Sequence, residues 1–253
     1  MIYFLLLFCL IVLFTIVYKF PFKKALPVLM YHSISKDTTS DLTVLLSELE
    51  QQFAYLKDHH YQTIFYDEID ESKKQVLITF DDGYVNNLDL LIPLLVQYNF
   101  KATLFIPFEF IGKKDEWWTN SQEIMTVDQL KSLDQNYVQL GWHSYSHQSY
   151  KKLSINEIKE DLLKSKNVIE VNSLPVAPIF AYPFGNFPKD QEKQNQLFAL
   201  FNEFGLQYAF RIGNKLNPFP LSNPFLVKRI DIKGTDGMAA FRWKLKFGRV
   251  KPF

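Results

Sequence analysis

The chain has 253 residues, of which 47% are hydrophobic and 16% aromatic, which is enough to bury one substantial core. Its formal net charge of +1 gives no support for nucleic-acid binding through bulk electrostatics. The single cysteine, Cys9, excludes an intramolecular disulfide framework.

The chain begins with an apolar, uncharged stretch from Ile2 to Tyr18. Its length is near the lower limit of the ~17–25 residues that cross a bilayer as a helix. Bulky residues, among them Phe20 and Phe22, stand where a signal-peptide cleavage site would need small ones. We therefore expect an uncleaved transmembrane signal anchor over residues 1–20 rather than a cleaved signal peptide.

After this stretch, strand-like and helix-like segments alternate. In chain order we expect strands over 27–31, 76–80, 102–106, 137–142, 179–182, 206–210 and 226–232. We expect helices over 42–56, 88–98, 126–133, 154–171 and 188–204. Such alternation favours one mostly parallel sheet, open or closed into a barrel, with active groups at the carboxyl ends of its strands.

Two adjacent carboxylates, Asp81 and Asp82, directly follow the strand that ends at Phe80, and Gly83 permits a sharp turn after them. Adjacent carboxylates in apolar surroundings repel each other. A bound metal ion would offset this repulsion by taking one as a ligand and leaving the other as a base. Asp-Gly pairs are also ordinary turn chemistry, so the pair alone leaves both interpretations open.

Two of the five histidines, His143 and His147, stand at i and i+4 directly after the strand over 137–142. On a helix this spacing would place both imidazoles on one face, and an irregular loop could bring them together as well. One aspartate and two histidines form an open set of three ligands, which leaves positions for water and substrate as catalytic metal sites require.

Three motifs in this order resemble those of the polysaccharide deacetylases, the NodB-homology group also called carbohydrate esterase family 4. Residues 79–83 match the TFDDG motif, residues 143–147 match H-S/T-x-x-H, and residues 183–185 match the end of the third motif. The resemblance implies an α/β fold, a distorted (β/α) barrel of the NodB-homology type. This catalytic domain would occupy residues 25–253, preceded by one N-terminal transmembrane helix.

The resemblance also implies residue roles. Asp81 would be the general base, and three residues would bind a divalent metal, usually Zn²⁺: Asp82, His143 and His147. The backbone N–H of Phe184 would help to stabilise the oxyanion, and Ser144 would orient the loop that carries the histidines.

Two departures from the family pattern point to one subgroup. Ala181 replaces the arginine that usually holds the base, and no histidine follows His147 to act as the acid. The early His32 resembles the acid of the circularly permuted poly-β-1,6-N-acetylglucosamine deacetylases, which also lack the arginine of the third motif. We therefore expect His32 to protonate the leaving amine, with a histidine bonded to a loop carbonyl as the alternative.

Charged residues near the end of the chain leave two interpretations open. Arg229 and Asp231 could partner the base and the acid, or they could form a surface ion pair.

Trp117 and Trp118 could stack on sugar rings or pack in the core. The alternation of apolar and basic residues over 241–249 favours an edge strand, with binding to anionic lipid or polymer as the alternative.

The function expected from the sequence is metal-dependent N-deacetylation of N-acetylglucosamine residues in an exported, poly-β-1,6-N-acetylglucosamine-like polysaccharide. The alternatives are a deacylase of a lipid-linked sugar or peptidoglycan, and an inactive glycan-binding module. An exported substrate requires an extracytoplasmic catalytic domain on a single-pass anchor. Lys19, Lys23 and Lys24 follow the apolar stretch and none precedes it, which favours the opposite orientation.

Overall fold

The computed structural model describes residues 25–249. The expected anchor over residues 1–20 therefore lies outside the described residues. Within the described part, no helix combines the length and the apolar character needed to cross a bilayer.

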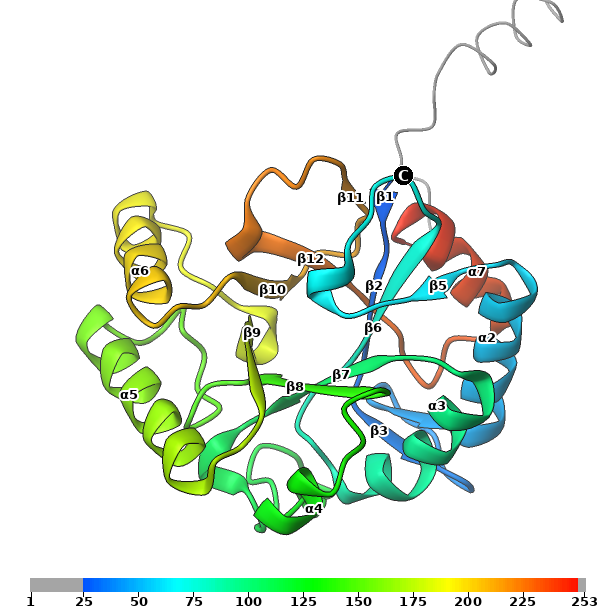
Figure 1. Ribbon diagram of the computed structural model, residues 1–253, viewed down its shortest axis with the longest axis horizontal. Helices are drawn as coiled ribbons and strands as arrows, with labels where there is room; N and C mark the ends of the chain where they lie inside the picture. The colour runs from blue at the N-terminus through cyan, green and yellow to red at the C-terminus, as the bar shows by residue number, and fades with distance from the viewer. Residues whose placement is uncertain (1–24, 250–253) are drawn as a thin grey trace, which may run out of the picture.

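The centre of the fold is a closed barrel of parallel strands (Figure 1). The alternation of segments had left an open sheet and a closed barrel as alternatives, and the family resemblance implied the barrel. Neighbouring strands follow the order β2-β12-β10-β9-β8-β7-β6, and pairing of β2 with β6 closes the ring. The barrel strands are β2 (Val28–Tyr31), β6 (Gln75–Phe80), β7 (Ala102–Ile106), β8 (Val138–Trp142), β9 (Val176–Ala181), β10 (Tyr208–Ile212) and β12 (Val227–Asp231).

Short strands extend this barrel at its ends. β5 (Gln62–Thr63) pairs with the start of β6, and β1 (Ala25–Leu26) pairs antiparallel with β11 (Asn217–Pro218). At the other end, β3 (Ser33–Ser35) pairs with β4 (Thr43–Leu45).

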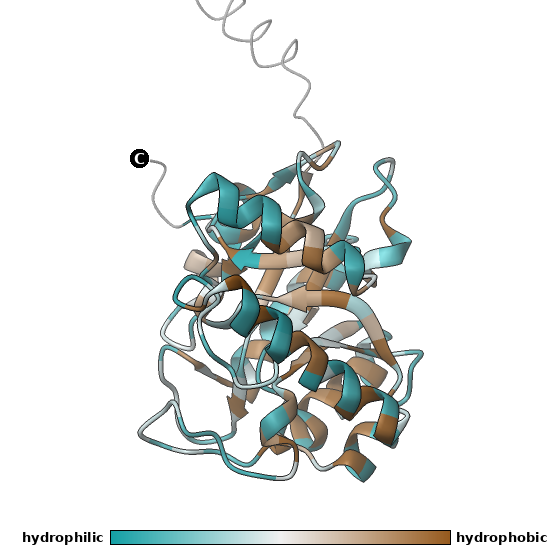
Figure 2. Cartoon of the chain, turned by 90° about the vertical axis from the view of Figure 1, so that its left-hand side faces the viewer, coloured by the Kyte–Doolittle hydropathy of each residue, from teal (hydrophilic) through white to brown (hydrophobic). Residues whose placement is uncertain are grey.

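Helices cover the outside of the barrel (Figure 1). They are α2 (Leu46–Asp58), α3 (Ile92–Tyr98), α4 (Val127–Lys131), α5 (Ile155–Asn172), α6 (Gln191–Glu203) and α7 (Met238–Phe247). Figure 2 shows polar and apolar stretches alternating along these helices, as expected for helices with one face on a core. The helix predicted over 42–56 begins only at Leu46 because β4 precedes it.

The apolar residues form two main clusters, one on each side of the barrel wall. On β6, Val76 and Ile78 belong to the larger cluster, which includes Phe53 of α2, whereas Leu77 belongs to the smaller one with Phe105. Successive side chains of a strand point to opposite faces. The smaller cluster is therefore the barrel interior, and the larger one lies between the barrel and its helices.

The edge strand predicted over 241–249 is wrong, because α7 occupies most of this segment. Phe241 and Leu245 are buried four residues apart, and both belong to the cluster between barrel and helices. Alternation of apolar and basic residues fits a strand, but burial at i and i+4 on the barrel's outer surface stabilises a helix instead.

Candidate active site

The barrel interior ends in polar groups at the carboxyl ends of the strands. On β6 the inward positions run Leu77, Thr79 and then Asp81, so the alternation that fills the barrel also points this carboxylate into its mouth. Asp82 then adopts a left-handed backbone, with φ of 72°, and Gly83 follows with φ of 62°. A Cβ on Gly83 would lie 2.6 Å from Cδ1 of Ile106, so this turn requires glycine.

Asp82, His143 and His147 come together at this mouth. Oδ1 of Asp82 lies 3.3 Å from Nε2 of His147 and 3.6 Å from Nε2 of His143. All three side chains are buried, and one potential ligand atom from each lies within 4.8 Å of the others. The structure thus places the predicted ligand set in one compact cluster.

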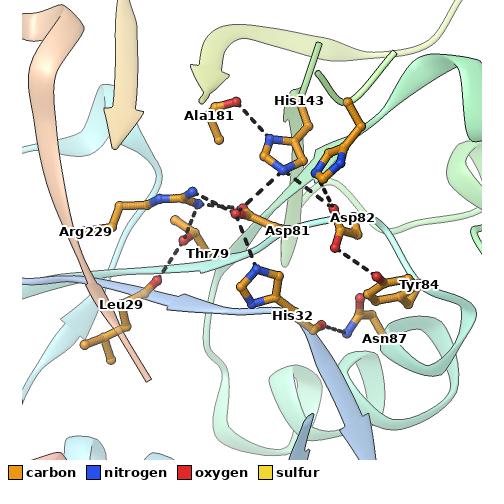
Figure 3. A network of polar contacts seen from close by, with 11 residues as sticks. Leu29, His32, Thr79, Asp81, Asp82, Tyr84, Asn87, His143, Ala181 and Arg229 are labelled. Carbon is orange, nitrogen blue, oxygen red and sulfur yellow. Dashed lines mark hydrogen bonds and ion pairs between the residues drawn. The ribbon is translucent and has the colours of Figure 1, made fainter. Parts of the chain in front are cut away.

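The cluster fits a divalent metal ion. Nδ1 of His143 lies 2.8 Å from the carbonyl oxygen of Ala181, which can only accept, so Nδ1 carries the proton and Nε2 presents a lone pair (Figure 3). That lone pair faces Oδ1 of Asp82, which is buried and has no hydrogen-bond partner among the described residues. Lone pairs that face each other in a buried site need a cation between them, and imidazole with carboxylate suits Zn²⁺ and similar ions.

A loop, not a helix, brings the two histidines together. His143 follows β8 directly, and both Ser144 and His147 have left-handed backbones, with φ of 66° and 52°. Oγ of Ser144 accepts a hydrogen bond of 2.9 Å from the backbone N–H of His147, so this serine does tie the two ends of the motif together.

Asp161 of α5 fixes this loop from outside and was not predicted from the sequence. Its buried carboxylate accepts hydrogen bonds from the backbone N–H groups of Tyr145 and Ser146, at 2.8 and 3.0 Å. It also accepts from Oγ of Ser146 and from the hydroxyl of Tyr150. The loop that carries both histidines is therefore held by a helix of the outer layer.

Asp81 is held by an arginine from β12. Arg229 is fully buried and donates two hydrogen bonds to the carboxylate, at 2.5 Å to Oδ1 and 2.7 Å to Oδ2 (Figure 3). Burial alone would raise the pKa of Asp81, but the charge of Arg229, with His143 beside it, outweighs burial and lowers that pKa. Asp81 is thus a carboxylate, able to accept a proton, at neutral pH.

In Figure 3 His32 lies below Asp81, whereas Arg229 approaches the same carboxylate from the left. Its Nε2 is 4.0 Å from Oδ2 of Asp81, and its backbone carbonyl accepts a hydrogen bond from Asn87. Asp231 ends β12 in the same region. Burial raises the pKa of Asp231, and the charge of His32 partly offsets this, but no hydrogen bond joins the two side chains within the described chain.

Tyr84 contacts the cluster although sequence analysis did not single it out. Its buried hydroxyl donates a 2.9 Å hydrogen bond to Oδ2 of Asp82, which leaves Oδ1 to face the histidines (Figure 3). Burial and the neighbouring Asp82 both raise the pKa of Tyr84, so the hydroxyl keeps its proton and remains a donor. Its only sequence signal is its position two residues after Asp82.

Aromatic rings surround His147. Trp117 stacks on its imidazole with ring centres 3.8 Å apart, so this indole face is used for packing rather than open to a sugar. Phe184 has a left-handed backbone, with φ of 57°, and its half-exposed ring lies 4.8 Å from the same imidazole. Trp118 is exposed and lines a hollow of about 260 Å³ together with Tyr84.

A second hollow of about 440 Å³ is lined by His147 and Phe184 among others. One hollow therefore borders the cluster at His147, and the other borders it at Tyr84, which donates to Asp82.

Comparisons with known proteins agree with this geometry. The sequence profile of the family described as "Polysaccharide deacetylase" matches residues 68–207. The protein YxkH of Bacillus subtilis (strain 168) is 31% identical over 176 residues, a match that spans 66% of this chain and 60% of that protein.

Solved structures share the fold. The deacetylase PplD of Streptococcus pyogenes superposes with a TM-score of 0.72 over 87% of this chain and 98% of its own, at 19% identity. IcaB of Ammonifex degensii superposes with a TM-score of 0.70 over 83% of this chain and 92% of its own, at 21% identity.

Proposed function

The chain belongs to the polysaccharide deacetylase family, hydrolases of carbohydrate amide bonds, and from this premise we propose that it is a metal-dependent N-deacetylase. Its substrate would be the acetamide groups of N-acetylglucosamine residues in a polysaccharide. The observation that carries the proposal is the buried Asp81, held by Arg229 beside an oxygen of Asp82 that has no hydrogen-bond partner among the described residues.

The chain's own residues divide the work of hydrolysis. Asp82, His143 and His147 would hold a divalent ion, most simply Zn²⁺, which when bound supplies Lewis-acid polarisation and activates water. Asp81 would take the proton from the attacking water, because Arg229 keeps it ionised. The backbone N–H of Phe184 would donate to the oxygen of the tetrahedral intermediate.

Collapse of that intermediate breaks the carbon–nitrogen bond and requires a proton on nitrogen. His32 is the proposed donor, because its Nε2 lies beside Asp81 and its side chain is partly open to solvent. The products are acetate and a free amine on the sugar. Asp231 would influence His32 through charge alone.

A poly-β-1,6-N-acetylglucosamine-like polymer is the proposed substrate. Ala181 at the end of β9 and the early histidine at the end of β2 are the two features that favour it. The two hollows that border the cluster suit a chain of sugars better than a single one. An exported polymer also implies that residues 1–20 anchor the protein in the cell membrane with the catalytic domain outside.

The test is release of free amine from a β-1,6-linked N-acetylglucosamine oligomer by the full chain loaded with Zn²⁺. We expect Asp81→Asn to abolish release, and Asp128→Asn, on the exposed face of α4, to leave it unchanged. Metal retained without release from this oligomer would redirect the search to peptidoglycan or a lipid-linked sugar. Absence of both metal and release would favour an inactive glycan-binding module.

A further inference from the structure

The C-terminal half of α7 carries a surface of cations and aromatic rings that the proposed chemistry does not use. We call this the α7 surface and define it by Lys74, Arg242, Trp243, Lys246 and Phe247, which line a hollow of about 480 Å³. The four α7 residues are exposed in the structure. Trp243 and Phe247 are 45% and 41% exposed, unusually open for rings of this size.

In the part of the chain that the structure describes, no carboxylate pairs with the positive charges of this surface. Lys74 lies 4.3 Å above the ring of Tyr61, Arg242 lies 5.2 Å above Tyr55, and Lys246 lies 5.2 Å above Phe247. None of the three forms an ion pair within residues 25–249.

A neighbouring hollow of about 400 Å³ is also lined by lysine side chains. It shares Lys74 and Lys246 with the first hollow and adds Lys73. Lys73 pairs with Asp70 at 3.3 Å, but among residues 25–249 no acidic residue lines either hollow. The ligand that this surface favours is therefore anionic.

The two exposed aromatic rings indicate that the anionic ligand also has an apolar part. Trp243 and Phe247 are four residues apart on α7, and their ring centres are 4.8 Å apart, so they form one apolar ridge beside the cations. The opposite face of the same helix, with Phe241 and Leu245, is already buried against the barrel. Exposed tryptophan among lysine and arginine is typical of segments that sit at the headgroup level of a bilayer.

The α7 surface lies at the end of the barrel opposite the catalytic groups. The hollow of about 400 Å³ is lined in part by Ala25, Pro27 and Gln75, which lie at the starts of β1, β2 and β6. The catalytic groups follow the other ends of the strands, and Figure 1 shows α7 beside β1. In the sequence, the apolar stretch Ile2–Tyr18 precedes Ala25 by only a few residues.

We propose that the α7 surface docks on a membrane containing anionic phospholipids, with Arg242, Lys246 and Lys74 on the headgroup phosphates and Trp243 and Phe247 in the interfacial layer. Docking in this way turns the mouth of the barrel away from the bilayer. The active site then faces polymer outside the membrane rather than lipid-linked sugar within it. The proposal rests on the α7 surface and holds whether or not the catalytic assignment is correct.

The test uses the full chain reconstituted with vesicles of phosphatidylcholine, alone or with phosphatidylglycerol, each containing lipids brominated on the upper acyl chain. Quenching of tryptophan fluorescence reports contact with the bilayer, and Trp243→Phe identifies the part due to Trp243, since the chain has four tryptophans. We expect Trp243-dependent quenching in the anionic vesicles that is lost in 0.5 M salt, an order of ionic strength at which surface attractions are screened.

Removal of two charges tests the electrostatic part. In the double variant Arg242→Gln/Lys246→Gln we expect the ratio of docked to undocked domain to fall roughly 30-fold at low salt, on the order of fivefold for each cation. The matched control is Lys131→Gln/Lys164→Gln on α4 and α5, which carries the same charge change far from the α7 surface and should not alter quenching.

Three results would overturn the proposal. One is the absence of Trp243-dependent quenching in anionic vesicles, and another is equal quenching in both kinds of vesicle. The third is salt-dependent binding of soluble poly(glycerol phosphate) through Arg242 and Lys246 without any quenching by lipid, which would make this a site for an anionic polymer.

Discussion

Replacement of Arg229 by methionine tests whether the buried pair with Asp81 is the element that organises the barrel mouth. Methionine keeps much of the side-chain volume but removes the charge and all donors. The variant therefore leaves a buried carboxylate without its two hydrogen bonds at 2.5 and 2.7 Å. Removal of one partner of a buried ion pair typically costs about 3–5 kcal/mol of stability.

The reverse change, Asp81→Asn, leaves a buried guanidinium without its counter-charge and should cost a similar amount. The double variant removes both charges together. We expect its loss of stability to be smaller than the sum of the two single losses by about 2–3 kcal/mol, because neither buried charge is then left alone.

The assay is urea unfolding of the metal-free protein in a chelating buffer, which separates the ion pair from metal binding. The matched control is Arg211→Met on β10, where the guanidinium is only half-buried and donates to the carbonyl of Ile212. There we expect a loss of about 1 kcal/mol or less, as for an ordinary partly exposed position.

The same substitution should change the pH dependence of turnover. Without Arg229, the positive charge that opposes the effect of burial on Asp81 is missing, so the pKa of Asp81 rises. The acid limb of the activity profile then moves to higher pH. Stability within 1 kcal/mol of the parent, additive single losses, or an unmoved acid limb would each refute this reasoning.

Three further predictions follow from the same site. Tyr84→Phe removes the bond to Oδ2 of Asp82 and should weaken metal binding by roughly 10- to 100-fold in chelator competition, whereas unchanged affinity would show that the hydroxyl does not position the ligand. His32→Ala should keep the metal, measured by elemental analysis, and lose on the order of 10²–10⁴ in turnover; loss of the metal would instead make His32 a ligand or a folding residue. Burial lowers the pKa of His143 to about 4, whereas the unfolded chain titrates near the ordinary histidine value of about 6.5. The free energy of unfolding of the metal-free protein should therefore be highest above about pH 6.5 and fall as the pH drops towards 4. Urea midpoints measured across that range should flatten in His143→Asn, and an unaltered slope would contradict this assignment.

The alternation of segments was sufficient to predict a mostly parallel sheet with polar groups at one edge, and the family resemblance predicted closure of this sheet into a barrel. Parallel strands place their carboxyl ends at one edge, so a carboxylate pair after one strand and a histidine pair after another must converge there.

Contacts made across the fold were not predictable in this way. Asp161 is one polar residue among many on α5, and only the packing of this helix against the loop at Tyr145 and Ser146 gives it a role. The α7 helix was missed because its alternating pattern fits a strand as well, and burial against the outer layer decided between them. From the sequence, Arg229 fitted a surface charge equally well, because its burial depends on the closure of the barrel.

The position of Arg229 explains why loss of the family arginine at Ala181 leaves the site intact. Both residues face the mouth of the barrel, since Ala181 belongs to the interior cluster and Arg229 is two positions after the interior Val227. What Asp81 requires is a guanidinium at its carboxylate, and Arg229 supplies it from β12.

The groups at the mouth of the barrel therefore come from two separate sets of strands. His143 and His147 come from the end of β8, on one side of β6. The groups that face Asp81 from the other side, His32 after β2 and Arg229 on β12, come from the two consecutive strands beyond β6. In the proposed mechanism, metal binding and proton transfer would therefore depend on different strands that meet at the Asp81-Asp82 pair. A substitution on β2 or β12 is then expected to alter turnover and to leave metal binding unchanged.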